Sequence, residues 1–195
     1  MPTVGIIPVK SFRFGNQRLA STLAENHRIG LGQALAGHVG ETAERAGLLP
    51  LFVTGDGEVL EWATSVGFPS VPDPGAGLDT AAAVGVEWAA ATGSRWIVIH
   101  SDLPLLEVDE LRELEGSGPV AIAPSSDGGT SAIAADVPVQ FSFGRGSFHR
   151  HLSRLVDAKV IASTGLLHDV DTASDLRSVL YHPRGAWLRE VVGWI

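Results

Sequence analysis

The stretch WIVIHSDLPLL, residues 96–106, carries the main signal for the fold. Its first five residues form a short apolar run that closes on a polar residue, which is typical of a strand buried on both faces. The polar SDLP segment follows at once, and Pro104 stiffens the exit from the strand. Because a strand buried on both faces belongs to a sheet covered by helices, this stretch predicts an α/β fold.

Apolar runs and helical patterns alternate on both sides of this strand. Strands or extended segments are predicted at 4–7, 51–54, around Val71, 120–123, 132–135 and 158–162. Helices are predicted at 26–46, 57–67, 77–91, 108–116, 147–157 and 172–179, with Asn26 capping the first and Thr172 or Asp171 capping the last. The alternation predicts a sheet with parallel members, whose ligand binds beyond the carboxyl ends of the strands.

Bulk properties narrow the classes of function. The 195 residues, with no shift in composition along them, predict one domain, 1–195. A formal net charge of −8 argues against a nucleic-acid partner. The absence of cysteine excludes disulfides and thiolate metal sites. Since no stretch has the length of a membrane span and the start lacks a signal-like pattern, we expect a cytoplasmic protein without membrane contact.

The tail, residues 181–195, holds two of the five tryptophans, Trp187 and Trp194. We expect it to pack back on the domain or on a second copy in a homodimer.

A basic loop, VKSFRFGNQRL at 9–19, follows the first predicted strand. Lys10 is one of only two lysines in the chain, so an anion site must rely on metal, backbone N–H groups and a few arginines. Lys10 and Arg18 are candidates for binding a triphosphate, Arg13 is left open, and the spacing does not fit a Walker A loop. The alternative is an ordinary solvated loop.

Three carboxylates follow predicted strands and suit a hard cation such as Mg²⁺. Asp102 comes directly after WIVIH, and it is early for the alternative role of capping the helix near Glu107. Asp169 and Asp171 alternate in the extended segment HDVDT and so point the same way. Asp171 could instead only cap the last helix.

Two glycine-bearing segments could bind an anion. PSSDGGTSA at 124–132 offers loop N–H groups, although ordinary turns look the same. FGRGSFHRH at 143–151 leads through Gly144 and Gly146 into a helix near Ser147, whose positive end suits a phosphate, or is simply capped. His149 and His151 lack the company of a zinc motif, and no hydrolase elbow is present.

In order and spacing, the segments IPVK…RLA, DLPLL, AP…GGTSA, FGRGSFHRH and DVDTASDL resemble one family over nearly the whole chain. This family is the guanylyltransferases of deazaflavin coenzyme F-420 biosynthesis, which join GTP to 2-phospho-L-lactate or phosphoenolpyruvate. The resemblance implies a Rossmann-like nucleotide-diphospho-sugar transferase fold, with a mixed, mainly parallel central sheet flanked by helices. It also implies an enzyme that transfers GMP and releases pyrophosphate.

The resemblance also implies roles for particular residues. Asp102, Asp169 and Asp171 would hold Mg²⁺; Lys10, Thr130, Gly144 and Ser147 would contact the phosphorylated acid or the phosphates; Gly77, Leu78 and Asp79 would face the base. The chain departs from the family pattern at Asn16, where a basic residue is usual, at Asp79, where the family has Asn in GLN, and at Ser131, where it has Asn. The alternatives are a nucleotidyltransferase for another acceptor, such as 3-phosphoglycerate or a sugar phosphate, and a paralogue that binds nucleotide without catalysis.

Overall fold

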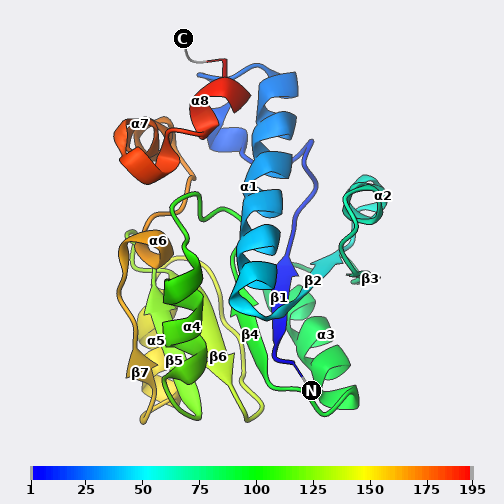
Figure 1. Cartoon of the computed structure of the whole chain (residues 1–195), viewed down its shortest axis with the longest axis vertical. Coiled ribbons are helices and arrows are strands. Elements are labelled where there is room, and N and C mark those ends of the chain that lie inside the picture. Colours follow the sequence, from blue (N-terminus) through cyan, green and yellow to red (C-terminus); the bar gives the residue numbers. More distant parts are fainter. Residues whose placement is uncertain (1, 194–195) are drawn as a thin grey trace.

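The computed structural model describes residues 2–193. Its centre is a seven-stranded sheet in the order β3-β2-β1-β4-β6-β5-β7 (Figure 1). The strands are β1 (Val4–Pro8), β2 (Leu49–Thr54), β3 (Ser70–Pro72), β4 (Trp96–Ile99), β5 (Val120–Pro124), β6 (Thr130–Ala135) and β7 (Lys159–Val160). The pairings are parallel except for those of β6, which is antiparallel to both β4 and β5. The predicted mixed, mainly parallel sheet is therefore confirmed.

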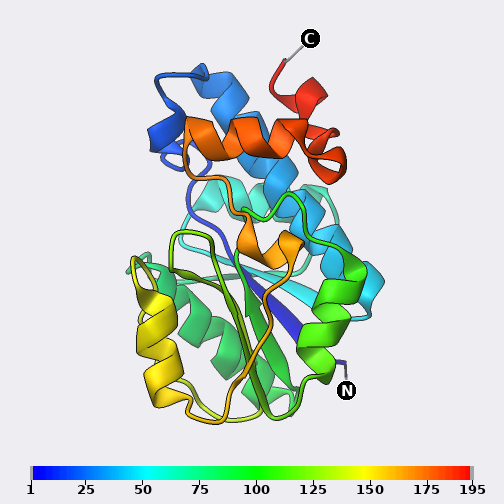
Figure 2. The same ribbon diagram turned by 90° about the vertical axis from the view of Figure 1, so that its left-hand side faces the viewer.

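Helices cover both faces of the sheet (Figure 2). They are α1 (Glu25–Ala46), α2 (Gly57–Ser65), α3 (Leu78–Ala91), α4 (Val108–Gly116), α5 (Ser147–Arg154), α6 (Thr164–Leu167), α7 (Ala173–Tyr181) and α8 (Leu188–Val191), with 3₁₀ turns η1 (Gln17–Leu19) and η2 (Pro183–Gly185). One core joins the sheet to α1, α2, α4 and α6, and a second joins it to α3 and α5. Among the described helices, none is long and apolar enough to cross a membrane.

The sequence of β1 explains why this strand lies inside the sheet rather than at its edge. All five of its residues are buried, and β2 and β4 pair with it on either side. Val4 and Ile6 pack into the core under α3, while Ile7 packs into the core under α1. This alternation is the period of two that a strand imposes, so a run that is apolar at every position suits a strand covered on both faces.

Several predicted boundaries shift. α1 begins at Glu25 with Ala24 in the N-cap position and no side-chain cap, so Asn26 lies inside the helix and the predicted cap is wrong. The Thr172 cap of α7 is confirmed, since its side chain accepts from the Asp175 N–H in a capping box. α5 ends at Arg154 rather than 157, because the chain leaves helical geometry at Leu155. α7 is not the last helix, because α8 follows it.

The tail packs back on the domain, as one of the two expected arrangements requires. Trp187 stacks on His38 of α1 with ring centroids 4.9 Å apart, and its indole N–H donates to Pro104 O at 3.2 Å. α7 and α8 bury Leu176, Val179 and Leu188 in a third core with residues of α1, beyond the end of the sheet (Figures 1 and 2). Trp194 lies outside the described residues, and the homodimer stays a prediction.

α3 lies unusually close to β1. A Cβ added at Gly85 would lie 2.3 Å from Ile6 Cγ2, well inside van der Waals contact. Ala81, Ala82 and Ala89, also on the buried side of α3, are correspondingly small. The distance between this helix and the sheet therefore depends on Gly85 having no side chain.

We predict that Gly85→Ala lowers the free energy of unfolding by about 1–3 kcal/mol, because the added methyl group overpacks the core. The melting temperature falls by roughly 2–4 °C per kcal/mol in a chain of this size. Gly30→Ala in α1 is the matched control, since an added Cβ there meets nothing within 4 Å, and it should gain up to about 1 kcal/mol of helix propensity. Equal stability of the two variants would contradict the packing argument.

Candidate active site

A cleft with a volume of about 440 Å³ opens at the carboxyl ends of β1, β2 and β4. Each of these strands is followed by polar residues that line it: Lys10 and Ser11 after β1, Gly55 and Asp56 after β2, and His100, Ser101 and Asp102 after β4. Because these strands are parallel, their carboxyl ends meet at one edge of the sheet, where ligands of such folds bind. Asp56 also caps α2 by accepting from the N–H groups of Glu58 and Val59.

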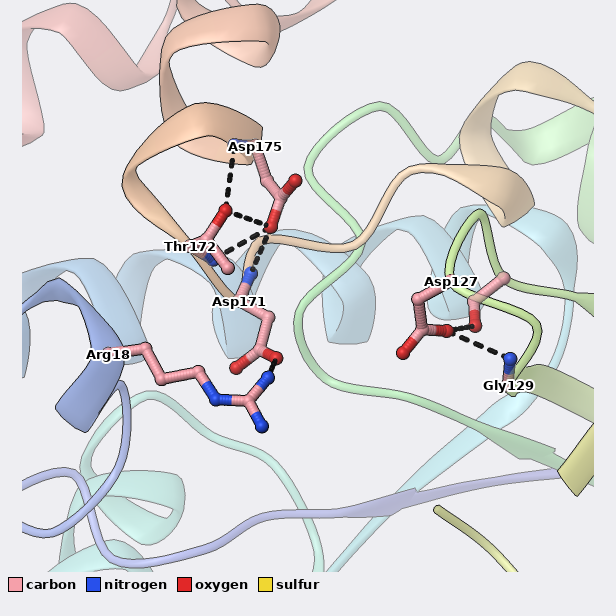
Figure 3. Close-up of polar contacts among 7 residues, drawn as sticks. Arg18, Asp127, Gly129, Asp171, Thr172 and Asp175 are labelled. Atoms are coloured by element: carbon pink, nitrogen blue, oxygen red, sulfur yellow. Dashed lines mark hydrogen bonds and ion pairs between the residues drawn. The ribbon is translucent and has the colours of Figure 1, made fainter. Parts of the chain in front are cut away.

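The basic loop forms one wall of the cleft. Lys10 and Asn16 line it, and Asn16 adopts the left-handed conformation (φ 52°). Arg13 is exposed and forms a salt bridge of 2.7 Å with Glu58. Arg18 forms a salt bridge with Asp171 (Figure 3). In this structure both arginines are thus paired with carboxylates, and Lys10 is the basic residue of the loop that lines the cleft.

The three predicted metal-binding carboxylates converge on this end of the sheet. The Val170 N–H donates to Asp102 O at 3.1 Å, so the HDVDT segment lies against the residue that follows β4. Asp102 and Asp171 both line the cleft. Asp102 Oδ1 is buried without a hydrogen-bond partner among the described residues, although 36% of the side chain is exposed.

Two of these carboxylates, Asp102 and Asp169, have raised pKa values, mainly because they are buried and to a lesser degree because acidic neighbours lie close. Burial raises the pKa of Asp102 to about 6, and the Asp171 carboxylate adds to the rise. Burial raises the pKa of Asp169 to about 7, with Asp102 as the next cause. Within residues 2–193, however, no three acidic or histidine side chains are arranged as a ready-made metal site. The carboxylates are close enough to repel one another, which suits a cation, but the metal assignment stays a prediction.

Sequence reasoning missed a fourth carboxylate, Asp127. One of its oxygens accepts from Ser125 Oγ–H at 2.6 Å and from the Gly129 N–H at 2.8 Å (Figure 3). The bond from Ser125 is the main cause that lowers the pKa of Asp127, so it stays charged. Its charge in turn contributes to the raised pKa values of Asp102 and Asp169. The signal was present as an aspartate before two glycines, the usual start of a side-chain turn.

The residues predicted to face the base divide into two groups. Gly77 and Leu78 line the cleft, and Gly77 has a positive φ of 105° before α3. Asp79, in the first turn of α3, instead accepts a hydrogen bond of 2.7 Å from the Phe143 N–H. Asp79 therefore ties the FGRGS turn to α3 in this structure.

Thr130 and Ser147 form a buried group beside this turn. Both are at most 1% exposed, and the Ser147 hydroxyl donates to Thr130 Oγ1 at 3.2 Å. His151 Nδ1 lies 3.0 Å from the same Thr130 oxygen, and the Ser142 N–H donates to His151 Nε2 at 2.8 Å. Gly144 lies in the exposed part of the turn with φ 105°. The structure thus brings together three of the four residues predicted to contact the acid or the phosphates, Thr130, Gly144 and Ser147, with His151 as an unpredicted neighbour. The fourth, Lys10, lines the cleft, whereas these three are not among its lining residues.

Arg28 was also missed. It is 9% exposed, and its Nε and Nη1 atoms are buried with no hydrogen-bond partner in residues 2–193. It precedes Gly32 by one turn of α1 and Leu35 by two, and both of these line the cleft. Residues at this spacing share a helix face, so Arg28 lies on the face of α1 that borders the cleft, although it is not itself among the lining residues.

Comparison with known proteins decides the family. Residues 3–193 match the family model described as "Guanylyl transferase CofC like". The chain belongs to this family. A phosphoenolpyruvate guanylyltransferase of Sphaerobacter thermophilus is 34% identical, over 95% of this chain and 97% of its own length. A 2-phospho-L-lactate guanylyltransferase of Methanothermobacter thermautotrophicus is 32% identical, over 97% and 89%.

Structural comparison bears on the fold. A Desulfovibrio desulfuricans G20 protein assigned to the nucleotide-diphospho-sugar transferases superposes with a TM-score of 0.74 at 18% identity, covering 97% of this chain and 95% of its own. The fold and the family predicted from the motifs are confirmed.

The structure shows what the side chains do at two positions, Asp79 and Ser131, where the chain departs from the family pattern. An asparagine oxygen could accept the Phe143 N–H just as Asp79 does, so this exchange preserves the tie between α3 and the FGRGS turn. Ser131 is fully buried and donates to the carbonyl oxygens of Ala123 and Pro124. Its side chain therefore serves the β5–β6 pairing.

The pKa of Asp169 makes stability depend on pH. Because this pKa is raised from 3.8 to about 7 on folding, the folded chain binds more protons than the unfolded chain between these values, and stability falls as pH rises through them. We predict that, in the presence of a chelator, Asp169→Asn melts at a higher temperature than the wild type near pH 7.5 and at nearly the same temperature near pH 4.

Asp109→Asn is the control for this measurement, since that side chain is 94% exposed. It should follow the wild-type dependence of melting temperature on pH. A parallel pair of curves for wild type and Asp169→Asn would show that the Asp169 carboxylate is not held protonated by the fold.

Proposed function

We propose that this protein transfers the guanylyl group of GTP to the phosphate of a small phosphorylated carboxylic acid, phosphoenolpyruvate or 2-phospho-L-lactate, and releases pyrophosphate. The observation that carries the proposal is the carboxylate-edged cleft at the carboxyl ends of β1, β2 and β4, in a chain of this family. The names of the two relatives above, each aligned over most of the chain, supply the two acids.

The chemistry needs little from the protein beyond alignment and charge. An oxygen of the acid's phosphate forms a bond to the α-phosphorus of GTP, and the bond from that phosphorus to the oxygen bridging to the β-phosphate breaks. The attacking oxygen is already anionic near neutral pH, so no general base is required. This agrees with the histidines of the site, because burial lowers the pKa values of His100 and His151 to about 4 and leaves both rings neutral.

Magnesium is part of the proposal. We assign Asp102, Asp169 and Asp171 as the residues that would hold it, because Asp102 Oδ1 has no hydrogen-bond partner among the described residues, the Asp171 charge adds to the raised pKa of Asp102, and the Asp102 charge adds to that of Asp169. When bound, the ion supplies charge neutralisation for the phosphates of both substrates. Arg18 now pairs with Asp171, so a cation at Asp171 would release the Arg18 guanidinium to the phosphates.

The test is pyrophosphate release from GTP and Mg²⁺ with each acid, beside ATP, CTP, 3-phosphoglycerate and a sugar phosphate. We expect release with GTP and at least one of the two named acids. Asp102→Asn should lower kcat by about 10² or more while leaving the fold intact, and Asp109→Asn should match the wild type. Release with a different acceptor alone would replace the proposed acid, and GTP binding without release on any acceptor would make the chain a nucleotide-binding paralogue.

Arg28 supports the triphosphate part of the proposal. A buried guanidinium without a counter-charge is unfavourable, and an anion in the adjoining cleft would supply the missing partner. Lys10 lines the cleft, while Arg13 is bound to Glu58. We therefore assign Arg28, with Lys10 and a released Arg18, to the phosphates of GTP.

We predict that Arg28→Gln raises the KM for GTP by about ten- to a hundredfold, the range for a hydrogen bond to a charged group. The melting temperature without ligand should stay the same or rise, because an unpaired buried charge is removed. Arg13→Gln is the control and should change the KM for GTP far less. Loss of stability with an unchanged KM would assign Arg28 to the fold instead.

A further inference from the structure

We infer that His151 is a positioning residue for the acid, whose contacts the family resemblance assigns to Thr130, Gly144 and Ser147: its two ring nitrogens fix Thr130 and the Ser142–Ser147 turn relative to each other. The inference rests on the proposed function, since it concerns how the acid is held. It starts from the two contacts of the ring, 3.0 Å from Nδ1 to Thr130 Oγ1 and 2.8 Å from Ser142 N to Nε2.

The contacts determine which nitrogen carries the hydrogen. The Ser142 N–H is a donor only, so Nε2 must accept. A neutral imidazole then carries its hydrogen on Nδ1 and donates it to Thr130 Oγ1. His151 is fully buried, and this burial is the main reason that its pKa falls to about 4 and the ring stays neutral.

The Thr130 hydroxyl is oriented as a result. Its oxygen accepts from His151 Nδ1–H and from the Ser147 hydroxyl, which uses both lone pairs. Its own hydrogen is used by neither of these contacts, and we assign it to an oxygen of the acid, which would have to reach a side chain that is 1% exposed in this structure. Thr130 is the first residue of β6 and Ser147 the first of α5, so one ring aligns a strand, a helix start and the turn between them.

The other hydrogen bonds of the turn do not connect it to Thr130. The Phe143 N–H donates to Asp79, and Arg150 donates to the carbonyl oxygens of Ser142 and Arg145, so the turn is held from outside as well. None of these bonds reaches Thr130. Phe143 packs edge-on against the His151 ring with centroids 5.0 Å apart. With both nitrogens bonded, the ring acts through Thr130 and the turn rather than on the reacting atoms.

Two substitutions separate the two nitrogens. His151→Asn retains a donor near the position of Nδ1, and His151→Gln retains an acceptor near the position of Nε2. We expect His151→Gln to raise the KM for the acid about tenfold, as loss of one buried hydrogen bond would, with the KM for GTP changed less than about twofold. His151→Asn should recover most of that loss. His149→Gln, on the same helix but exposed, should match the wild type.

Kinetics and melting temperature together decide the outcome. All assays are run well below the lowest melting temperature of the set, so that every variant is folded. The inference is supported if the KM for the acid rises selectively in His151→Gln and is largely restored in His151→Asn. Unchanged KM values with a lowered melting temperature, or equal rises for acid and GTP, would reduce His151 to a structural role.

Calorimetric binding of phosphoenolpyruvate and of phospholactate to each variant keeps the inference separate from the proposed function. If the wild type binds an acid but does not turn it over, the proposed function fails. The inference about His151 is then still tested by the dissociation constants of that acid for His151→Gln and His151→Asn. If the wild type neither binds nor converts either acid, both fail.

Discussion

The backbone hydrogen bond from Val170 N–H to Asp102 O is the contact on which the acidic end of the cleft depends. It joins the end of β4 to a segment that follows much later in the chain, and Val170 is buried with Leu105 in the core beneath α7. Together with this apolar packing, the bond keeps the segment of Asp169 and Asp171 near Asp102, where the Asp171 charge raises the pKa of Asp102 and the Asp102 charge raises that of Asp169. The fold therefore supplies, through backbone and apolar packing, the energy that opposes their repulsion, and the proposed cation site rests on this arrangement.

The reversed strand β6 brings the other half of the site to the same edge. β5 is parallel to β7 and ends at the cleft side of the sheet, where the turn that carries Asp127 follows. Because β6 runs back antiparallel, its first residue, Thr130, also lies at that edge. If a parallel crossover replaced this hairpin, β6 would begin at the opposite edge of the sheet, and Thr130 would lie there, away from the Asp127 turn. The mixed sheet is thus the reason that the Asp127 turn and Thr130 lie at the same edge as the cleft.

The sequence predicted the sheet and the strand-end residues because both follow from local pattern. Runs that are apolar at every position must be covered on both faces, and polar residues directly after them must lie at one edge. Contacts between distant segments carry no such pattern, so the pairing of Arg18 with Asp171, the bond from Phe143 to Asp79 and the environment of Arg28 needed the structure. His151 was dismissed as a metal ligand, and its two contacts appear only when β6, α5 and the turn are folded together.

The proposed binding of GTP by an acidic chain requires that its few basic side chains are not all neutralised by its own carboxylates. In this structure Arg13 and Arg18 are paired with Glu58 and Asp171, while Arg28 is buried with two nitrogens unpartnered. Exposed pairs contribute little stability and exchange partners readily, so pairing leaves Arg18 available at a small energetic loss. A buried guanidinium is different, since leaving it unpaired is unfavourable and binding an anion relieves that cost. In the proposed function the two arrangements complement each other: a cation at Asp171 would release the Arg18 guanidinium, and the buried Arg28 would gain in the phosphates the partner that it lacks among the described residues.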